Sequence, residues 1–165
     1  MPPVAKHAQP STQLASPPPD FALRYEWREG SVPPPYHYEY AIRVGPGAGG
    51  EVLFYPDYPQ HNPPVWHEDV AVSPQALAAV YELMGRQGVF RRVWRQPERH
   101  TVGGSQSWLE VTAGGHTVTV PAALAGDQAQ AVAPVYAAIR ALASEDLWRS
   151  LMARYEAFQQ QSPER

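Results

Sequence analysis

The sequence predicts an α+β protein with a single, mainly antiparallel sheet and helices packed on one face of that sheet. Three observations support this prediction. Six segments show the apolar–polar alternation of half-buried strands, three stretches show the spacing of amphipathic helices, and the two kinds of element do not alternate as they do in parallel α/β folds.

Length and composition favour one folded domain behind a tail. The chain has 165 residues, of which 44% are hydrophobic, and this is enough to build one core without a metal or a disulfide. Residues 1–20 are rich in proline and show no periodicity, which predicts a disordered tail. Residues 17–19, three consecutive prolines, belong either to a plain extended leader or to a ligand for an SH3-like groove. We therefore expect a tail over 1–20 and one domain over 21–160.

The composition also excludes several classes of function. Cysteine is absent, which excludes disulfides, thiolate catalysis and thiolate metal sites. The formal net charge of −3 does not attract the chain to nucleic acid or to an anionic membrane. No segment has the pattern of a secretory signal or the length of a membrane span, and arginine, alanine and proline are abundant. These features predict a bacterial, cytoplasmic protein without a membrane partner.

The first half of the domain contains four predicted strands. Apolar and polar residues alternate over residues 21–27 and again from Tyr36 to Val44, and Gly45 to Gly50 then forms a loop before a returning strand over 51–55. A fourth, shorter strand is expected over 66–72. The glycine loop matches the G-x-G-x-x-G string of dinucleotide-binding loops, but a strand follows it where that motif needs a helix. We therefore predict a hairpin loop and no cofactor.

A helix is predicted after the fourth strand. Ser73 can cap the free amides of its first turn, Pro74 suits the first helical position, and Gly85 or Gly88 can end it. Phe90 is expected to anchor the end of this helix in the core.

A tight hairpin is predicted around Gly114 and Gly115, because two glycines accept the positive φ angles of a two-residue turn. Pairing Ala113 with His116 places the apolar side chains on one face. The core-facing residues are then Leu109, Val111, Val118 and Val120. The opposite face carries Trp108, Glu110, Thr112, Thr117 and Thr119.

Two helices are expected to close the domain. Pro134 can open the first of them, with the residues before it forming a loop or an extra turn. Ser144 then caps a second helix, with two acidic residues in its first turn. Its apolar stripe consists of Leu147, Trp148, Leu151, Met152, Tyr155 and Phe158. Residues 159–165 are expected to fray.

Two groups of residues have the chemistry of a site. His61, His67, Glu68 and Asp69, with His37 and Asp57 across the sheet, are residue types that bind metals, but they lack the spacing of a known metal motif. We therefore predict no metal and no catalytic residue. The other group is a basic segment with aromatic residues, which suits an acidic partner or is a solvated loop. Its candidate binding residues are Arg86, Arg91, Arg92, Trp94, Arg95 and Arg99.

The order of helix, Phe90, basic loop, glycine-turn hairpin and helix over residues 73–143 resembles that of emfourin-type bacterial inhibitors of thermolysin-like proteases. The resemblance is one of layout, and the additional N-terminal strands and C-terminal helix depart from that small domain. It implies inhibition of a metalloprotease and carries over no inhibitory residue.

The sequence thus predicts a non-enzymatic protein-binding or regulatory module that contacts an unknown protein partner. The alternative is a small enzyme with a polar site near Tyr36–Tyr40 and His61–Asp69. A cleft lined by convergent polar groups would favour the enzyme, and dispersal of these groups would favour the module.

Overall fold

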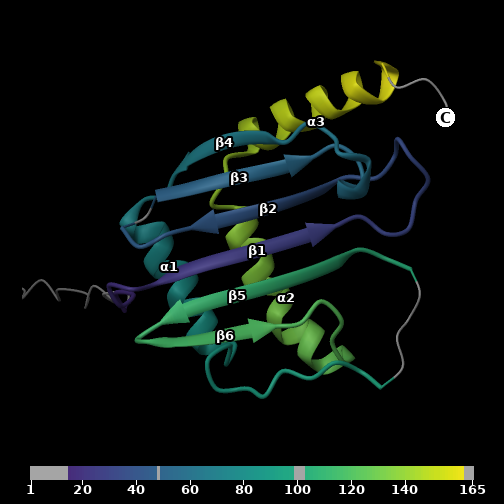
Figure 1. The fold of residues 1–165 in the computed structure, drawn as a ribbon. Helices are drawn as coiled ribbons and strands as arrows, with labels where there is room; N and C mark the ends of the chain where they lie inside the picture. Colours follow the sequence, from purple (N-terminus) through teal and green to yellow (C-terminus); the bar gives the residue numbers. More distant parts are fainter. Residues whose placement is uncertain (1–14, 48, 99–102, 162–165) are drawn as a thin grey trace, which may run out of the picture.

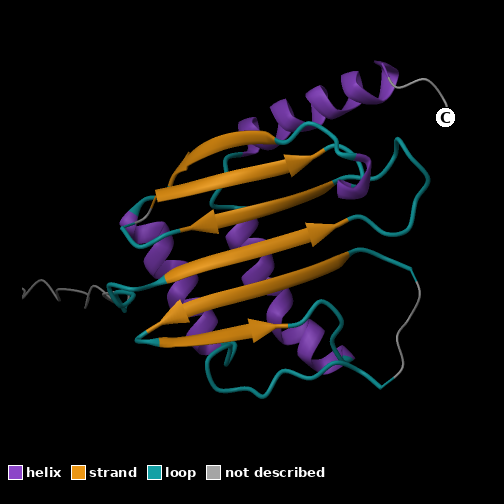
Figure 2. Cartoon of the chain, viewed as in Figure 1, coloured by secondary structure: helices purple, strands orange, loops and turns teal. Residues whose placement is uncertain are grey.

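The structure is a computed structural model that describes residues 15–47, 49–98 and 103–161. Six strands form one antiparallel sheet in the order β4-β3-β2-β1-β5-β6, and the helices lie on one face of it (Figures 1 and 2). The predicted fold class is therefore confirmed. In chain order the elements are β1 (Ala22–Arg28), β2 (Glu39–Val44), β3 (Gly49–Tyr55), η1 (Pro59–His61), β4 (Trp66–Ala71), α1 (Pro74–Arg86), β5 (Gln106–Ala113), β6 (His116–Val120), α2 (Gly126–Arg140) and α3 (Glu145–Gln161).

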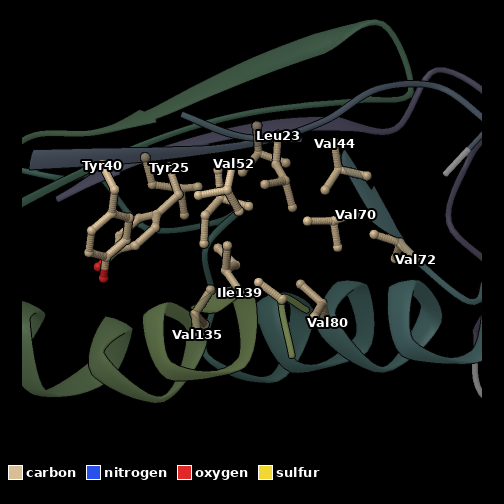
Figure 3. Packing of buried hydrophobic residues seen from close by; sticks show 14 of the residues in the cluster. Leu23, Tyr25, Tyr40, Val44, Val52, Val70, Val72, Val80, Val135 and Ile139 are labelled. Carbon is tan, nitrogen blue, oxygen red and sulfur yellow. The ribbon is translucent and has the colours of Figure 1, made fainter. Parts of the chain in front are cut away.

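The N-terminal strand β1 lies in the middle of the sheet. It pairs with β2 on one side and with β5 on the other, so within the described sheet it joins the β1–β4 meander to the β5–β6 hairpin. Leu23 and Tyr25 are 4% and 3% exposed, because both edges of β1 are paired and helices cover its inner face. Figure 3 shows this core, with the valines of the sheet facing Val80, Val135 and Ile139 of the helices.

The β5–β6 hairpin has the predicted register. Ala113 pairs with His116, and Leu109 pairs with Val120. Gly114 has a φ of 59° and the next glycine a φ of 76°, as a tight turn of this type requires. The predicted core-facing side chains are buried, apart from Val118, which is half-buried.

Asp20, which lies just before β1, binds the turn between β5 and β6. Its two carboxylate oxygens accept hydrogen bonds from the amides of Gly114 and Gly115, at 2.8 and 2.6 Å. These bonds to Gly115 and Gly114 lower the pKa of the Asp20 carboxyl. The predicted tail therefore ends in a residue that contacts the fold. The part of that prediction on residues 1–14 lies outside the described residues.

Helix α1 begins as predicted, because the Ser73 hydroxyl accepts a hydrogen bond from the amide of Ala76 at 3.1 Å. It ends with Gly88 at a φ of 74° and with the Val89 amide bound to the Met84 carbonyl at 2.9 Å, the bond that closes a Schellman motif. Phe90 packs against the core as predicted, and its neighbour Val89 shares this role. Val89 is fully buried, whereas Phe90 is half-buried.

Helix α2 begins at Gly126, eight residues before the predicted start at Pro134, which lies inside the helix. Proline 134 has no amide hydrogen for the carbonyl of Gln130, and both residues are exposed, so water can satisfy that carbonyl. Helix α3 begins as predicted, with the Leu147 amide bound to the Ser144 hydroxyl at 3.2 Å.

Strand β2 is shorter than predicted. It begins at Glu39, and Tyr36 lies in the preceding loop with 59% of its surface exposed. The Pro35 carbonyl in this loop accepts a hydrogen bond from the Tyr155 hydroxyl of α3 at 3.1 Å, so the loop turns toward the helix layer before the strand starts. The glycine loop between β2 and β3 is a hairpin loop, as predicted, although β3 already begins at Gly49.

An aromatic row crosses the inner face of the sheet from β1 to β4. The strand register aligns its members directly with one another, and we call them the aromatic row: Trp27, Tyr40, Phe54 and Trp66. Helix α3 places one ring against each of three members. Trp148 lies 4.8 Å from Tyr40, Tyr155 lies 6.0 Å from Phe54, and Phe158 lies 6.3 Å from Trp66, measured between ring centroids.

We predict that replacing Leu109 by alanine lowers the free energy of unfolding by about 2–5 kcal/mol, since the side chain is fully buried. Replacing the neighbouring Glu110, on the outer face of the sheet, by alanine should change the free energy of unfolding by less than about 0.5 kcal/mol. Urea denaturation of both variants measures the difference. Equal losses in the two variants would contradict the register described above.

Candidate functional site

A cavity of about 350 Å³ lies between the inner face of the sheet and helices α2 and α3. This volume is in the range of small-molecule sites. We call it the aromatic cavity, because seven of the side chains around it are aromatic. Its lining consists of Tyr25, Trp27, Tyr38, Tyr40, Phe54, Ser107, Ala133, Tyr136, Ala137, Arg140, Trp148 and Met152.

The cavity opens where the aromatic row ends. Trp27 is the last ring of the row, and its neighbour on β5 in the same register is the small Ser107. The described ring contacts of Trp27 are with Tyr38, at 4.9 Å, and Tyr40, at 5.3 Å. No aromatic residue in the described part of α3 covers Trp27 as others cover the rest of the row. Small side chains on one side and rigid rings on the other therefore leave this space unfilled.

Two helices provide the opposite wall. Tyr136 and Arg140 are one turn apart on α2 and share a face of the helix. Trp148 is fixed at the start of α3, because its indole nitrogen donates a hydrogen bond to the Arg140 carbonyl at 3.1 Å. The alanines at positions 133 and 137 of α2 are exposed and form the rim.

Tyrosine hydroxyls converge on the cavity. The hydroxyls of Tyr25 and Ser107 lie 3.0 Å apart and bind each other. Figure 3 shows the rings of Tyr25 and Tyr40 side by side, with their hydroxyls directed toward the helix layer. The Tyr136 ring lies 5.0 Å from that of Tyr25, and its hydroxyl oxygen is buried without a hydrogen-bond partner among the described residues. A buried hydroxyl without a partner is unfavourable, so it is a place where a ligand atom gains a bond.

Burial keeps these hydroxyls protonated. Desolvation raises the pKa of Tyr25, Tyr40 and Tyr136 above the usual value of 10. Desolvation also raises the pKa of Tyr38, and the carboxylate of Glu29 adds to that increase. At neutral pH the phenols are neutral hydrogen-bond donors, as an unperturbed tyrosine is, and burial keeps them neutral to higher pH.

Arg140 is the charged residue among the described residues that line the cavity. Its guanidinium lies 4.6 Å above the Trp148 ring, in a cation–π contact. Its nearest acidic partner is Glu145, at 3.9 Å, whose side chain is 78% exposed. This ion pair is loose, and Arg140 also lowers the pKa of Tyr25, Tyr38 and Tyr40 against the larger effect of burial. The cavity therefore combines apolar walls with hydrogen-bond donors and one positive charge.

A second cavity, of about 360 Å³, lies on the outer face of the sheet around Trp108. Trp108 faces away from the core, as predicted, and the Arg24 guanidinium lies 5.7 Å from its ring. The charged side chains of this cavity are already engaged with one another, because Glu26 forms ion pairs with both Arg24 and Arg28, and Arg28 also pairs with Glu39. We therefore regard the aromatic cavity as the stronger candidate.

The histidines and acidic residues of the predicted enzyme site form separate pairs and not one cluster. His37 is buried and its Nε2 lies 2.9 Å from Glu39, while the Nδ1 of His61 lies 2.9 Å from Asp57. The Tyr58 ring stacks on His37 at 3.6 Å and meets the edge of His61 at 5.7 Å. This cluster packs the loop between β3 and β4 against the start of β2.

The rest of that predicted site lies on β4. His67 and Asp69 are exposed on the outer face, whereas Glu68 pairs with Arg154 of α3 at 3.7 Å, so the alternation of the strand separates them as predicted. His67 is 3.9 Å from Glu51. Within the described part of the chain, no three histidine, cysteine or acidic side chains are grouped closely enough to hold a metal ion.

The predicted arginine segment lies at the end of α1 and in the loop after it. Arg86 forms an i,i+4 ion pair within the helix. Arg91 donates to the Gly85 carbonyl at 3.2 Å, and Arg92 donates to the Gln87 carbonyl at 2.9 Å. These two arginines satisfy carbonyls at the negative end of the helix and so have a structural role that the sequence did not indicate.

The loop that follows is braced against α2. Trp94 is half-buried and donates its indole N–H to a carbonyl of the same loop at 3.0 Å. The Gln128 side chain accepts from the amide of Arg95, at 3.0 Å, and donates to the carbonyl of Val93, at 2.8 Å. The Arg95 side chain is exposed. Arg99, the last residue of the predicted binding set, lies outside the described residues.

Sequence reasoning assigned most of the aromatic cavity to the core. Tyr38 and Tyr40 belonged to the predicted enzyme region, but Trp27, Tyr136 and Arg140 were not proposed as site residues. The feature of the sequence that could have indicated the cavity is the high number of tyrosines and tryptophans at core-facing positions. Such positions are more often occupied by aliphatic residues.

Comparison with models of known protein families finds no match, and comparison with curated proteins finds no significant match either. The resemblance to emfourin-type inhibitors therefore stays a prediction. No helix in the described part of the chain is long and apolar enough to cross a membrane.

We predict that the protein loses stability as the pH rises above 10. Burial raises the pKa of Tyr155 to about 12, whereas the same group in the unfolded chain titrates near 10. Above pH 10 the unfolded state releases protons that the folded state keeps, so stability present at lower pH is lost as the pH rises toward 12. Urea denaturation across this range measures the loss, and Tyr155→Phe should reduce it. Stability that stays constant over this range would refute the burial of the phenols.

We predict that Arg91→Glu and Arg92→Glu each lower the free energy of unfolding by about 0.3–1 kcal/mol, because each puts a negative charge beside the carbonyl end of α1. Arg95→Glu is the matched control, and its effect should be close to zero. Thermal denaturation compares the three variants. If Arg95→Glu lowered the free energy of unfolding as much as the other two variants, the effect would come from the charge of the loop and not from the helix end.

Proposed function

We propose that this protein is a non-enzymatic binding module that holds the apolar or aromatic part of a ligand in the aromatic cavity. The observation that carries the proposal is a cavity of ligand size whose aromatic walls enclose a buried hydroxyl without a described partner. The proposal keeps the predicted class of function and assigns the ligand to a different surface from the arginine segment.

The energetics of packing support a binding role for this cavity. A ligand that covers apolar wall surface removes it from water, which is favourable in proportion to the area covered. Here the walls include Trp27, Tyr40 and Trp148, and the rim is formed by alanines of α2. A ligand in this space covers those walls and can also bind the hydroxyl of Tyr136.

A protein partner at the arginine segment is the second candidate. Val93 is an exposed apolar residue, with 69% of its surface accessible, and it lies between the exposed Arg92 and Arg95. Gln128 holds the backbone of this loop on both sides of Trp94, so the loop is presented in one conformation. An apolar residue between cations suits an acidic protein surface. The predicted enzyme, the metalloprotease inhibitor and the bacterial cytoplasmic setting stay predictions.

The cavity proposal is tested by titrating the protein with 2-naphthamide, a neutral aromatic probe, and following the binding by calorimetry. We expect one binding site per chain. Ala137→Phe fills the rim of the cavity and should weaken binding by about tenfold or more, or about 1.4 kcal/mol. Ala129→Phe is the matched control, because Ala129 is exposed on the same helix and lies outside the lining. Binding that is absent, or insensitive to Ala137→Phe, would overturn the proposal.

A further inference from the structure

We propose that the ligand of the aromatic cavity carries a carboxylate, which binds Arg140 and the hydroxyl of Tyr136 while its apolar body packs against the rings. This inference rests on the proposed function and adds the chemical class of the ligand. It is argued from the donors that line the cavity and from the charge of the lining.

Arg140 has donor capacity left for a ligand. A guanidinium has five N–H donors, and among the described residues no hydrogen bond engages those of Arg140. Its contacts are the face of Trp148 and the loose pair with Glu145. Stacking on the indole leaves the edge of the guanidinium plane open, and this edge is what binds a carboxylate through two parallel hydrogen bonds.

Tyr136 supplies a second donor on the same wall. It precedes Arg140 by one helical turn, so both side chains project from one face of α2 into the cavity lining. The neighbouring Tyr25 hydroxyl is already bound to Ser107, whereas that of Tyr136 has no partner among the described residues. A carboxylate has enough lone pairs to accept from a guanidinium and from a phenol at the same time.

The charge of the lining selects the anion. The described lining contains one cation and no carboxylate, and the nearby acids Glu145 and Glu29 lie outside it, so Arg140 attracts an anion and repels a cationic ligand. One arginine compensates one negative charge, and burying a second would leave it unpaired. A monoanionic carboxylate therefore fits better than a phosphate dianion. The apolar walls require the remainder of the molecule to be hydrophobic or aromatic.

The experiment compares 2-naphthoate with 2-naphthamide, which have the same ring system and differ in the charged group. We expect wild-type protein to bind the carboxylate about tenfold or more tightly, with a preference that falls as salt rises. Arg140→Gln should bring the affinity for 2-naphthoate down to that for 2-naphthamide and leave the amide unaffected. Tyr136→Phe should weaken the carboxylate more than the amide. Arg149→Gln, an exposed arginine of α3, is the matched control and should change neither.

The outcomes separate this inference from the proposed function. Equal affinity of wild-type protein for both probes, with loss of both in Ala137→Phe, would overturn the carboxylate inference and leave the cavity proposal standing. Failure of both probes to bind would overturn the cavity proposal. Should Arg140→Gln fail to fold, as judged by its circular dichroism, the wild-type comparison of the two probes and Tyr136→Phe decide the question. A titration with inorganic phosphate tests the excluded dianion, and competition by phosphate against 2-naphthoate would contradict the choice of a carboxylate.

Discussion

The aromatic row on the inner face of the sheet is the constraint from which the helix layer and the cavity follow. Antiparallel pairing of four successive strands aligns Trp27, Tyr40, Phe54 and Trp66, and this alignment depends on register alone. Helix α3 then lies where its own rings meet the last three of these. Large aromatic side chains bury about 150–250 Å² each, so these contacts decide the position of α3 more strongly than its exposed ends do. Trp27, the first ring of the row, has no aromatic partner in the described part of α3.

This arrangement explains why the cavity lies where it does. Helix α2 covers the sheet on the far side of Trp27, but it presents alanines at positions 133 and 137 and a tyrosine at 136. An aliphatic core would close such a gap by small shifts of flexible side chains, whereas indole and phenol rings held by stacking cannot follow. The fold thus keeps a space next to Trp27 and leaves the hydroxyl of Tyr136, a residue of its wall, buried without a described partner. A purely structural core would place phenylalanine or leucine there at no cost in packing.

The elements that the sequence predicted well are those whose signals are local. The β5–β6 register follows from two glycines and strict alternation, and the starts of α1 and α3 follow from serine caps. The start of α2 was missed because its N-cap is Ala125, which has no capping side chain, and because Pro134 imitates a first helical position. The cavity was missed for a different reason. Whether Tyr136 fills the core or lines a cavity depends on how α2 and α3 are placed relative to each other. No local sequence pattern specifies that placement.

The arginine segment shows how the same residue type can serve two purposes on one chain. Arg91 and Arg92 bind carbonyls at the end of α1, so part of the apparent basic patch is consumed by the fold. Arg140 lies in the last turn of α2, as Arg86 does in α1, and its guanidinium binds no carbonyl among the described residues and lies across Trp148. The carbonyl of Arg140 instead accepts hydrogen bonds from the indole of that tryptophan, at 3.1 Å, and from the amide of Ala143, at 3.3 Å. Because Trp148 and the backbone amides that follow the helix satisfy the carbonyls of this helix end, the guanidinium of Arg140 is not needed there and lies in the wall of the aromatic cavity.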